Sequence, residues 1–294
     1  MYLIGPGTIL KHRFKFIQKI GQGSFGEIYS AEDLANQEIV AVKLERWDSQ
    51  KAVLRSEVQV LRKLQASSFV CRYIFCGNCE EHNFLVMELL GDSLSELRRR
   101  RPDGCFSAHT TARLGVQMVR AVEAIHGIGF LHRDVKPSNF AMGRGPGRRE
   151  QCVMFDFGLA RKFLLPSGQI RPPRNIAGFR GTARYASINS HLCRELARRD
   201  DLWSVLYVLI EFFTGQLPWR RLKDRDEVGR MKMMTTTEEL VWDLPCEFAA
   251  IARHLETLDF EERPAYTDIC GLLERMAAAA GPDPGCYDWD LDGS

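Results

Sequence analysis

Apolar and polar residues alternate along the first part of the chain in the manner of β-strands. The alternation covers residues 13–45, and within it Ile39–Leu44 is a mostly apolar, β-rich run. Residues 50–65 change to helical spacing, and strand-like runs return at 73–75 and 84–87. The pattern predicts a small sheet accompanied by one helix.

Beyond Gly91 the periodicity is mainly helical. A long amphipathic stretch, a mostly apolar stretch typical of a buried central helix and two shorter helical stretches occupy residues 107–128, 201–214, 245–257 and 265–279. Turn-forming residues dominate from Gly281 onward. We therefore predict an α+β chain with a sheet-rich part at 14–90, a larger, mainly helical part at 91–280 and a loose C-terminal tail at 281–294.

Composition narrows the class of protein only a little. With 294 residues, 45% of them hydrophobic and 27% charged, the chain suits one large globular domain or two halves around a cleft. The net charge of +2 is too small to indicate a nucleic-acid partner. No apolar run has the length of a membrane span, and the first residues lack the features of a secretory signal.

The cysteines favour a reducing compartment. There are nine, without the spacing of a disulfide framework, as expected of thiols in the cytosol or nucleus. Cys71, Cys76 and Cys79 come closest to a metal-binding cluster. Because no second Cys/His pair lies at a zinc-like distance, buried or surface thiols are the favoured interpretation.

A glycine-rich segment joins two of the expected strands. It runs Gly21-Gln22-Gly23-Ser24-Phe25-Gly26-Glu27-Ile28, and its glycines would let the backbone approach phosphate groups without a Cβ clash. Phe25 at the tip would shield those phosphates from water. Taken alone, the motif fits a plain hairpin turn equally well. A dinucleotide site is disfavoured because there the glycine loop leads from a strand into a helix.

A pair of opposite charges is expected next to that segment. Lys43 ends the run Val40-Ala41-Val42, from which a cation can reach the α- and β-phosphates of a nucleotide. Glu57, in the middle of the expected helix, is its natural anionic partner. Two solvated surface charges are the weaker alternative, because a lysine in so apolar a strand is unfavourable without partners.

Two further motifs add carboxylates and an amide. The octapeptide His132-Arg133-Asp134-Val135-Lys136-Pro137-Ser138-Asn139 is too specific for an ordinary surface loop. Within it, Asp134 would accept or orient the proton of a substrate hydroxyl, and Lys136 would neutralise charge on a transferred phosphoryl group. Asn139 and Asp156 would hold Mg²⁺, with Asp156 at the end of an apolar strand in Asp156-Phe157-Gly158.

An apolar slot for adenine is expected at Met87–Gly91, where the two parts of the chain connect. Met87 would close the back of the slot, and backbone groups of Glu88 and Leu90 would bind the base. With the residues of the roof and the loop, the expected ATP-binding set is Ile20, Gly21, Gln22, Gly23, Ser24, Phe25, Gly26, Glu27, Ile28, Ala41, Lys43, Met87, Glu88 and Leu90.

The order of these motifs is more informative than any one of them. Together they are the parts with which a protein kinase transfers the γ-phosphoryl group of ATP, using Mg²⁺. The expected catalytic residues are Lys43, Glu57, Asp134 and Lys136. A pseudokinase that binds nucleotide or partners without turnover is the alternative. It is disfavoured because Lys43, Asp134 and Asp156 are all present.

Residues 12–290 resemble the protein kinases of the casein kinase 1 group. The residues that indicate this are Ser187-Ile188-Asn189, which stand where most kinases carry Ala-Pro-Glu. Further segments narrow the resemblance to the tau-tubulin kinases, namely Gly129–Asp134, Pro137–Arg144, Arg171–Arg174, Ala177–Thr182, Gly215–Arg220 and Tyr287–Asp290.

The resemblance implies a bilobal protein kinase fold with a sheet-rich N-lobe and a larger, mainly helical C-lobe. It implies transfer to Ser or Thr of protein substrates such as tau or tubulin, with little need for phosphorylation of the activation loop. The expected protein is a monomer with neither nucleic-acid nor membrane partners. Its expected location is the cytoplasm, with the cytoskeleton or the nucleus as alternatives.

The resemblance also implies a basic pocket on the substrate side of the cleft. In the casein kinase 1 group, a pocket matching Arg184 and Lys223 receives a phosphorylated or acidic residue upstream of the target. Guanidinium groups suit this task because they bind phosphate through two hydrogen bonds. Solvated charge that only aids solubility is the alternative.

Three other features carry charge outside the expected cleft. Arg98–Arg101 resembles a nuclear-import patch, but it falls at the end of an expected helix, where cations suit the helix dipole, and we favour the second interpretation. Asp201 is expected to brace the catalytic loop from the buried helix. Arg263 stands where kinases place the partner of the Ala-Pro-Glu glutamate. Since Asn189 replaces that glutamate, we expect Arg263 to find another partner or to face water.

Overall fold

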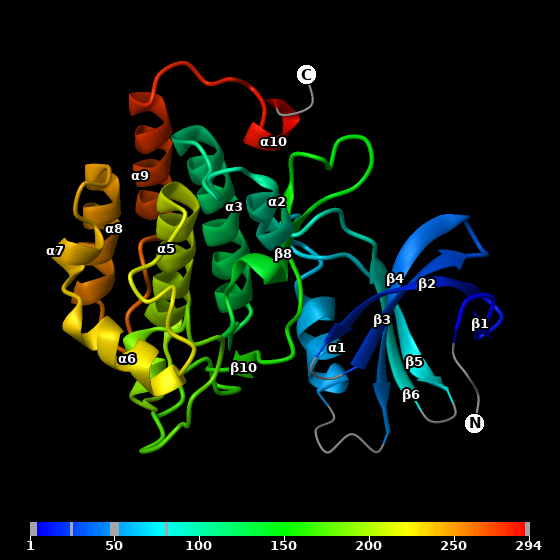
Figure 1. Ribbon diagram of the computed structural model, residues 1–294. Helices are drawn as coiled ribbons and strands as arrows, with labels where there is room; N and C mark the ends of the chain where they lie inside the picture. The colour runs from blue at the N-terminus through cyan, green and yellow to red at the C-terminus, as the bar shows by residue number, and fades with distance from the viewer. Residues whose placement is uncertain (1–4, 24–25, 48–52, 80–81, 292–294) are drawn as a thin grey trace.

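The computed structural model of the chain describes residues 5–23, 26–47, 53–79 and 82–291. Figure 1 shows two lobes, a sheet with one helix beside it and a larger helical body. The first lobe contains β1 (Ile9–Leu10), β2 (Phe14–Gly23), β3 (Gly26–Asp33), β4 (Glu38–Arg46), α1 (Leu54–Lys63), β5 (Tyr73–Cys79) and β6 (His82–Glu88). This arrangement confirms the predicted α+β class.

The sheet of the first lobe is antiparallel throughout, with strand order β1-β2-β3-β4-β6-β5. Residues Val40 to Glu45 of β4 are all buried. This explains why β4 reads as a nearly continuous apolar run, since neither face of the strand meets water. The helix α1 packs against β5 and β6 and buries Leu54, Val60 and Leu61.

The second lobe is built around two long helices, α3 (Ala108–Gly127) and α5 (Arg198–Thr214), which pack on each other. The other helices are α2 (Leu94–Arg100), α4 (Ile188–His191), α6 (Arg225–Met234), α7 (Thr237–Leu240), α8 (Cys246–Thr257), α9 (Tyr266–Ala279) and α10 (Asp288–Leu291). The four long helices expected from the sequence are confirmed, with ends that differ by no more than a turn. Within the described residues, no helix is both long enough and apolar enough to cross a bilayer.

Local capping explains where α5 begins and ends. It starts at Arg198, earlier than the apolar pattern indicates, because the Asp200 carboxylate accepts a hydrogen bond from the Ala197 amide at 2.7 Å and closes the first turn. It stops at Gly215, whose φ of 77° lies in the left-handed region that favours glycine.

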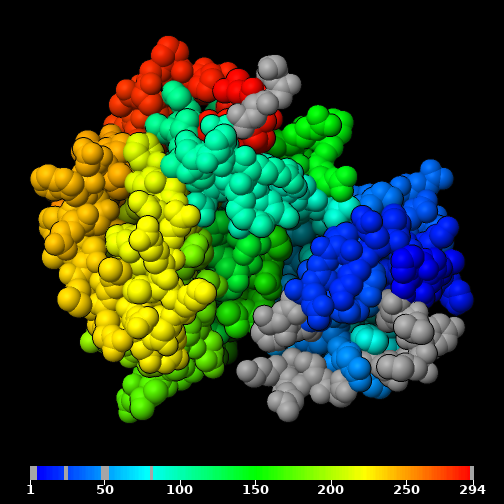
Figure 2. Space-filling view, viewed as in Figure 1, coloured from blue at the N-terminus to red at the C-terminus, as the bar shows by residue number. Residues whose placement is uncertain are grey.

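Short strands carry the motif residues between the lobes. These are β7 (Phe130–Leu131), β8 (Phe140–Met142), β9 (Cys152–Met154) and β10 (Arg161–Lys162), with the 3₁₀ turn η1 (Pro137–Asn139) before β8. β8 pairs with β9, and the Phe155 amide donates to the Asn139 carbonyl at 3.0 Å. The pairing therefore brings Asn139 next to the residues that precede Asp156. In Figure 2 green surface is visible between the blue sheet lobe and the yellow helices.

The C-terminal segment differs from the loose tail that its turn residues indicate. Figure 1 shows α10 lying beside α2 and α3. Tyr287 is buried and stacks on Trp289 with ring centroids 4.6 Å apart. The Asp288 carboxylate accepts from the amide and the hydroxyl of Ser107, at 2.7 and 2.6 Å, just before α3. The segment is held by the burial of its aromatic side chains and by this cap. The sequence pattern predicts neither, because the turn residues at Gly281–Gly285 dominate it.

We expect Asp288→Ala to lower the free energy of unfolding by about 1–3 kcal/mol, because the buried Asp288 carboxylate no longer accepts from the Ser107 amide and hydroxyl. Urea denaturation would measure this loss. Asp283→Ala is the comparison, because Asp283 belongs to the same segment but pairs with Arg113 at the surface. This variant should lose less stability than Asp288→Ala. Equal effects would show that Asp288 does not anchor the segment.

Candidate active site

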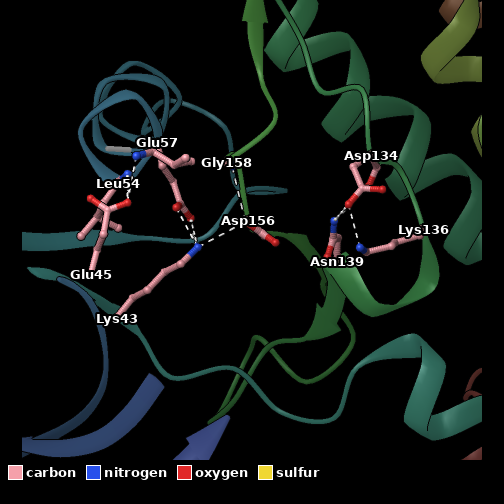
Figure 3. Close-up of polar contacts among 10 residues, drawn as sticks. Lys43, Glu45, Leu54, Glu57, Asp134, Lys136, Asn139, Asp156 and Gly158 are labelled. Atoms are coloured by element: carbon pink, nitrogen blue, oxygen red, sulfur yellow. Dashed lines mark hydrogen bonds and ion pairs between the residues drawn. The ribbon is translucent and has the colours of Figure 1, made fainter. Parts of the chain in front are cut away.

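A cluster of three charges joins the two lobes. Lys43 lies on β4 and is buried, and its Nζ contacts both oxygens of Glu57 on α1, at 2.7 and 3.0 Å. The same Nζ donates to Oδ1 of Asp156 at 3.2 Å. Figure 3 shows Glu57 and Asp156 converging on the end of the Lys43 side chain. The structure thus confirms the partner predicted for Lys43 and adds a second one.

Two members of the cluster, Lys43 and Asp156, keep their charges at neutral pH. Burial lowers the pKa of the Lys43 ammonium, but the carboxylates of Glu57 and Asp156 outweigh it, so the pKa of Lys43 is raised above its ordinary value. Burial acts on Asp156 in the opposite sense and raises its pKa, yet the contact with Lys43 lowers the pKa of Asp156 overall. A positive Lys43 and an ionised Asp156 therefore lie side by side.

A second polar network surrounds Asp134. Its Oδ2 accepts from Lys136 Nζ at 2.7 Å, and its Oδ1 accepts from the Thr182 hydroxyl at 2.8 Å. The side-chain amide of Asn139 donates to the Asp134 carbonyl at 2.9 Å. The residues of the octapeptide thus meet as predicted. Thr182 completes the network, although the sequence assigned it no role in the site.

Close backbone contact places Thr182 at this network. Its neighbour Gly181 has a φ of 96°, and a Cβ there would lie 2.6 Å from the Arg133 carbonyl oxygen. Glycine therefore allows the segment to approach the octapeptide closely. The run Gly181-Thr182 was part of the family resemblance, but the contact with Asp134 depends on a backbone geometry that spacing alone does not reveal.

Asp201 holds the octapeptide from beneath. It is buried on α5, and its carboxylate accepts from the amides of His132 and Arg133, each at 2.8 Å, and from His126 at 2.9 Å. The φ of Arg133 is 66°, an unusual value for a residue with a side chain, and these bonds support it. The predicted bracing role of Asp201 is confirmed.

Two connected cavities lie between the lobes. One, of about 250 Å³, contains the charged residues and is lined by Ile28, Lys43, Glu57, Met87, Asp134, Lys136, Phe155, Asp156, Leu159, Gly181 and Thr182. The other, of about 210 Å³, is more apolar and is lined by Ile20, Gly21, Ile28, Ala41, Cys71, Met87, Glu88, Leu89, Leu90, Gly91, Ser93, Glu96, Ala141 and Phe155. Because the cavities share Ile28, Met87 and Phe155, they form one polar and one apolar part of a single cleft.

The glycine-rich segment connects β2 to β3, as predicted, and no helix follows it. This removes the main support for a dinucleotide site. Gly26 leaves no room for a side chain, since a Cβ there would lie 1.7 Å from the Leu44 carbonyl oxygen. Ser24 and Phe25 lie outside the described residues. Gln22 and Glu27 both accept from Lys19 and are not among the residues that line the cleft.

The structure limits which backbone groups of the connector a ligand can use. Met87, Glu88 and Leu90 line the apolar cavity as expected. The Glu88 amide, however, donates to the Arg72 carbonyl at 3.0 Å, so it is already engaged within the protein. The Glu88 side chain accepts from the Arg72 amide and pairs with Arg148. A ligand would therefore have to use the Glu88 carbonyl.

The two residues predicted for a phosphate pocket have different surroundings. Arg184 is half-buried, and its Nη1 contacts Oε1 of the fully buried Glu211 at 3.2 Å. Lys223 is exposed. Among the contacts of the described residues, none links Lys223 to Arg184. Arg263 has found another partner, since its Nη2 lies 3.1 Å from Glu123.

The cleft has the donor set of a magnesium site. The side-chain amide nitrogen of Asn139 donates to Asp134, so the amide oxygen remains as a ligand. The Asp156 carboxyl is ionised. Figure 3 shows a carboxylate oxygen of Asp156 directed toward Asn139 and away from Lys43. Mg²⁺ prefers such oxygens and is commonly held by one or two carboxylates together with phosphates. The residues present therefore fit the ion.

Comparison with known proteins defines the class. Residues 14–271 match the family model described as the protein kinase domain, so the chain belongs to the protein kinase family. A probable serine/threonine-protein kinase of Dictyostelium discoideum is 52% identical over 286 residues, which are 97% of this chain and 58% of the relative. A putative serine/threonine-protein kinase of Caenorhabditis elegans is 34% identical over 295 residues, with 97% of this chain and 84% of the relative covered. The chain is thus a kinase domain of the serine/threonine class, with the bilobal α+β fold of that family.

We expect Lys43→Met to destabilise the protein by about 3–5 kcal/mol at neutral pH, because the fully buried Glu57 loses its counter-charge. Burial raises the pKa of Glu57 above its unfolded value, so the protonated carboxyl is the form that the folded state tolerates. The stability that the variant loses relative to the wild type should therefore be smallest below a pH of about 4.3, the usual pKa of glutamate, and grow as the pH rises. Urea denaturation at several pH values measures this. Lys15→Met, at an exposed position, is the control, and a pH dependence like that of the control would contradict the expectation.

Proposed function

We propose that this protein is an ATP-dependent serine/threonine protein kinase of the tau-tubulin kinase type, within the casein kinase 1 group. One observation carries the proposal of an active enzyme. Lys43 is bound to Glu57 and to Asp156 in the same cavity that contains Asp134 and Lys136. In a kinase these parts must be assembled together before phosphoryl transfer can occur.

The proposed chemistry follows from the positions of the charges. Lys43 would contact the α- and β-phosphates of ATP, while Glu57 holds it in place. Mg²⁺ bound at Asp156 and Asn139 would neutralise charge on the phosphates. Asp134 would orient the substrate hydroxyl and accept its proton, and Lys136 would stabilise charge on the transferred group.

The apolar half of the cleft would bind adenine. Ile20, Ile28 and Ala41 lie on the sheet side, and Met87 lies at the junction of the two cavities. Such a slot buries the flat base, and backbone groups at its rim would supply directional hydrogen bonds. The Glu88 carbonyl and the backbone of Leu90 are the groups we assign to that role.

Substrate preference is the second part of the proposal. We infer that proteins such as tau or tubulin are substrates and that acidic or previously phosphorylated sites are preferred, with Arg184 and Lys223 as the receiving cations. The support is the resemblance of Ser187-Ile188-Asn189 and the neighbouring segments to this group. A monomer in the cytoplasm, with the cytoskeleton or nucleus as alternative locations, completes the proposal.

The segment after Thr182 has its own anchor. The Ser187 hydroxyl and the Asn189 amide both donate to Oδ1 of Asp200 on α5, at 2.6 and 3.0 Å. A neutral pair of donors thus fixes the segment where other kinases use a glutamate. This supports assignment to the casein kinase 1 group, because it explains how Ser187-Ile188-Asn189 can hold the segment in place without the glutamate of Ala-Pro-Glu.

We expect Asp134→Asn to reduce phosphate transfer from ATP and Mg²⁺ to tau by about 10²- to 10⁴-fold, the usual contribution of a general base. Nucleotide binding should persist, because Asp134 does not line the apolar cavity. Radiolabel transfer and a fluorescent-nucleotide titration would measure the two properties. Asp268→Asn, at an exposed position on α9, is the matched control. Nucleotide binding without transfer in the wild-type protein would instead favour a pseudokinase.

We expect the double variant Arg184→Ala, Lys223→Ala to lower the preference for a primed peptide over its unprimed counterpart by about tenfold, the size of one charge-assisted hydrogen bond. The measurement is kcat/KM for both peptides. Arg253→Ala with Arg275→Ala removes the same charge from exposed positions on α8 and α9. Equal loss on both peptides would exclude a phosphate pocket at these residues.

A further inference from the structure

A carboxylate on β4 binds the beginning of α1. Glu45 is buried, with 1% of its surface exposed, and its Oε1 accepts from the amides of Val53 and Leu54 at 2.8 and 3.0 Å. Figure 3 shows the Glu45 side chain reaching the first turn of the helix next to the Lys43–Glu57 pair. None of the proposed steps of phosphoryl transfer uses Glu45.

The helix needs this contact because its own sequence provides no cap. The first amides of a helix have no partner within it, and the residue before the first turn usually supplies one. In α1 that residue is Val53, whose side chain makes no capping bond. Glu45 takes over the task from another element, and its negative charge also suits the positive end of the helix dipole.

Strand geometry couples this cap to the cluster at Lys43. Residues two apart on a strand point to the same face, so Lys43 and Glu45 both face α1. Lys43 binds Glu57, one turn into the helix, and Glu45 binds the amides of Val53 and Leu54. A basic and an acidic side chain of β4 therefore bind two different points of α1. Together they fix the position of the helix and its rotation about its axis.

Stability alone is a poor explanation for Glu45. Its Oε2 is buried, and among the described residues no hydrogen-bond partner for it is found. A buried carboxylate oxygen without a partner lowers stability. A residue retained only to stabilise the fold would not carry this penalty, whereas one that must place α1 correctly would.

We propose that Glu45 is a positioning residue that holds α1 so that Glu57 meets Lys43. The inference rests on the proposed function, because the Lys43–Glu57 pair matters only if phosphates are bound there. It adds that the helix is held by a contact within the sheet lobe, without a requirement for a partner protein.

The first test compares Glu45→Ala with Glu38→Ala, which removes a carboxylate from the same strand that contacts Arg72 and not α1. Hydrogen exchange at the Val53 and Leu54 amides should be about five- to tenfold faster in Glu45→Ala, the usual effect of losing a helix cap, and unchanged in Glu38→Ala. The kcat for phosphate transfer should fall by a similar factor. Unchanged exchange, or a kcat within about twofold of wild type, would overturn the proposal.

The second test asks whether Glu45 acts through Glu57. In a Glu57→Gln background, the further change Glu45→Ala should lower kcat by less than about twofold, since the pair it positions is already lost. If the double variant instead loses kcat by the product of the two single losses, Glu45 acts independently of Glu57. Glu45 would then contribute only to general stability. If Glu45→Ala does not fold, Glu45→Met fills a similar space without an acceptor for the two amides, and the same cycle applies to it. If the wild-type protein transfers no phosphate, the exchange measurement alone decides the capping claim, and the proposed activity fails separately.

Discussion

The burial of Lys43 is the constraint on which the cleft depends. An ammonium group in an apolar strand is unfavourable unless carboxylates come to meet it, and here they come from two different elements. Glu57 requires α1 to lie close to the sheet, and Asp156 requires the segment after β9 to reach up from the helical lobe. Satisfying one cation thus fixes the sheet, the helix and the second lobe relative to one another.

A second constraint fixes the floor of the cleft. Asp201 engages the amides of His132 and Arg133, so the octapeptide follows the position of α5. The His126 ring, bonded to Asp201 and to the Tyr266 hydroxyl, extends the same network to α3 and α9. Asp134 is therefore held by the packed helices, while Lys43 is held by the sheet. Each lobe carries part of the charge that a phosphoryl group would need, and the cleft is complete only where they meet.

The contacts that the sequence reveals are those that depend on spacing. Apolar periodicity locates the strands and the long helices, because a buried face repeats at a regular interval. The pairing of Lys43 with Glu57 can also be predicted, since an apolar strand and an amphipathic helix leave each charge few alternatives. Thr182, Glu211 and Asp288 could not be found in this way. Their contacts join residues far apart in the chain, and they depend on a left-handed glycine, a helix face and a docked tail, respectively.

The surroundings of Arg184 show how little of the substrate side is free to respond to a ligand. The Trp219 indole donates to the Arg184 carbonyl at 2.8 Å, and Lys232 donates to the carbonyl of Ala186. Between them, the Tyr185 hydroxyl donates to Glu211 at 2.6 Å. These bonds fix the backbone, so only the Arg184 guanidinium can adjust. That group already shares Glu211 with Arg98, so the carboxylate and its two cations together carry a net charge of +1. A phosphate would therefore bind through the donors that Arg184 still has free, while Glu211 reduces the attraction without abolishing it. For the phosphate pocket that we propose, this balance would favour a preference for primed sites over an absolute requirement for them.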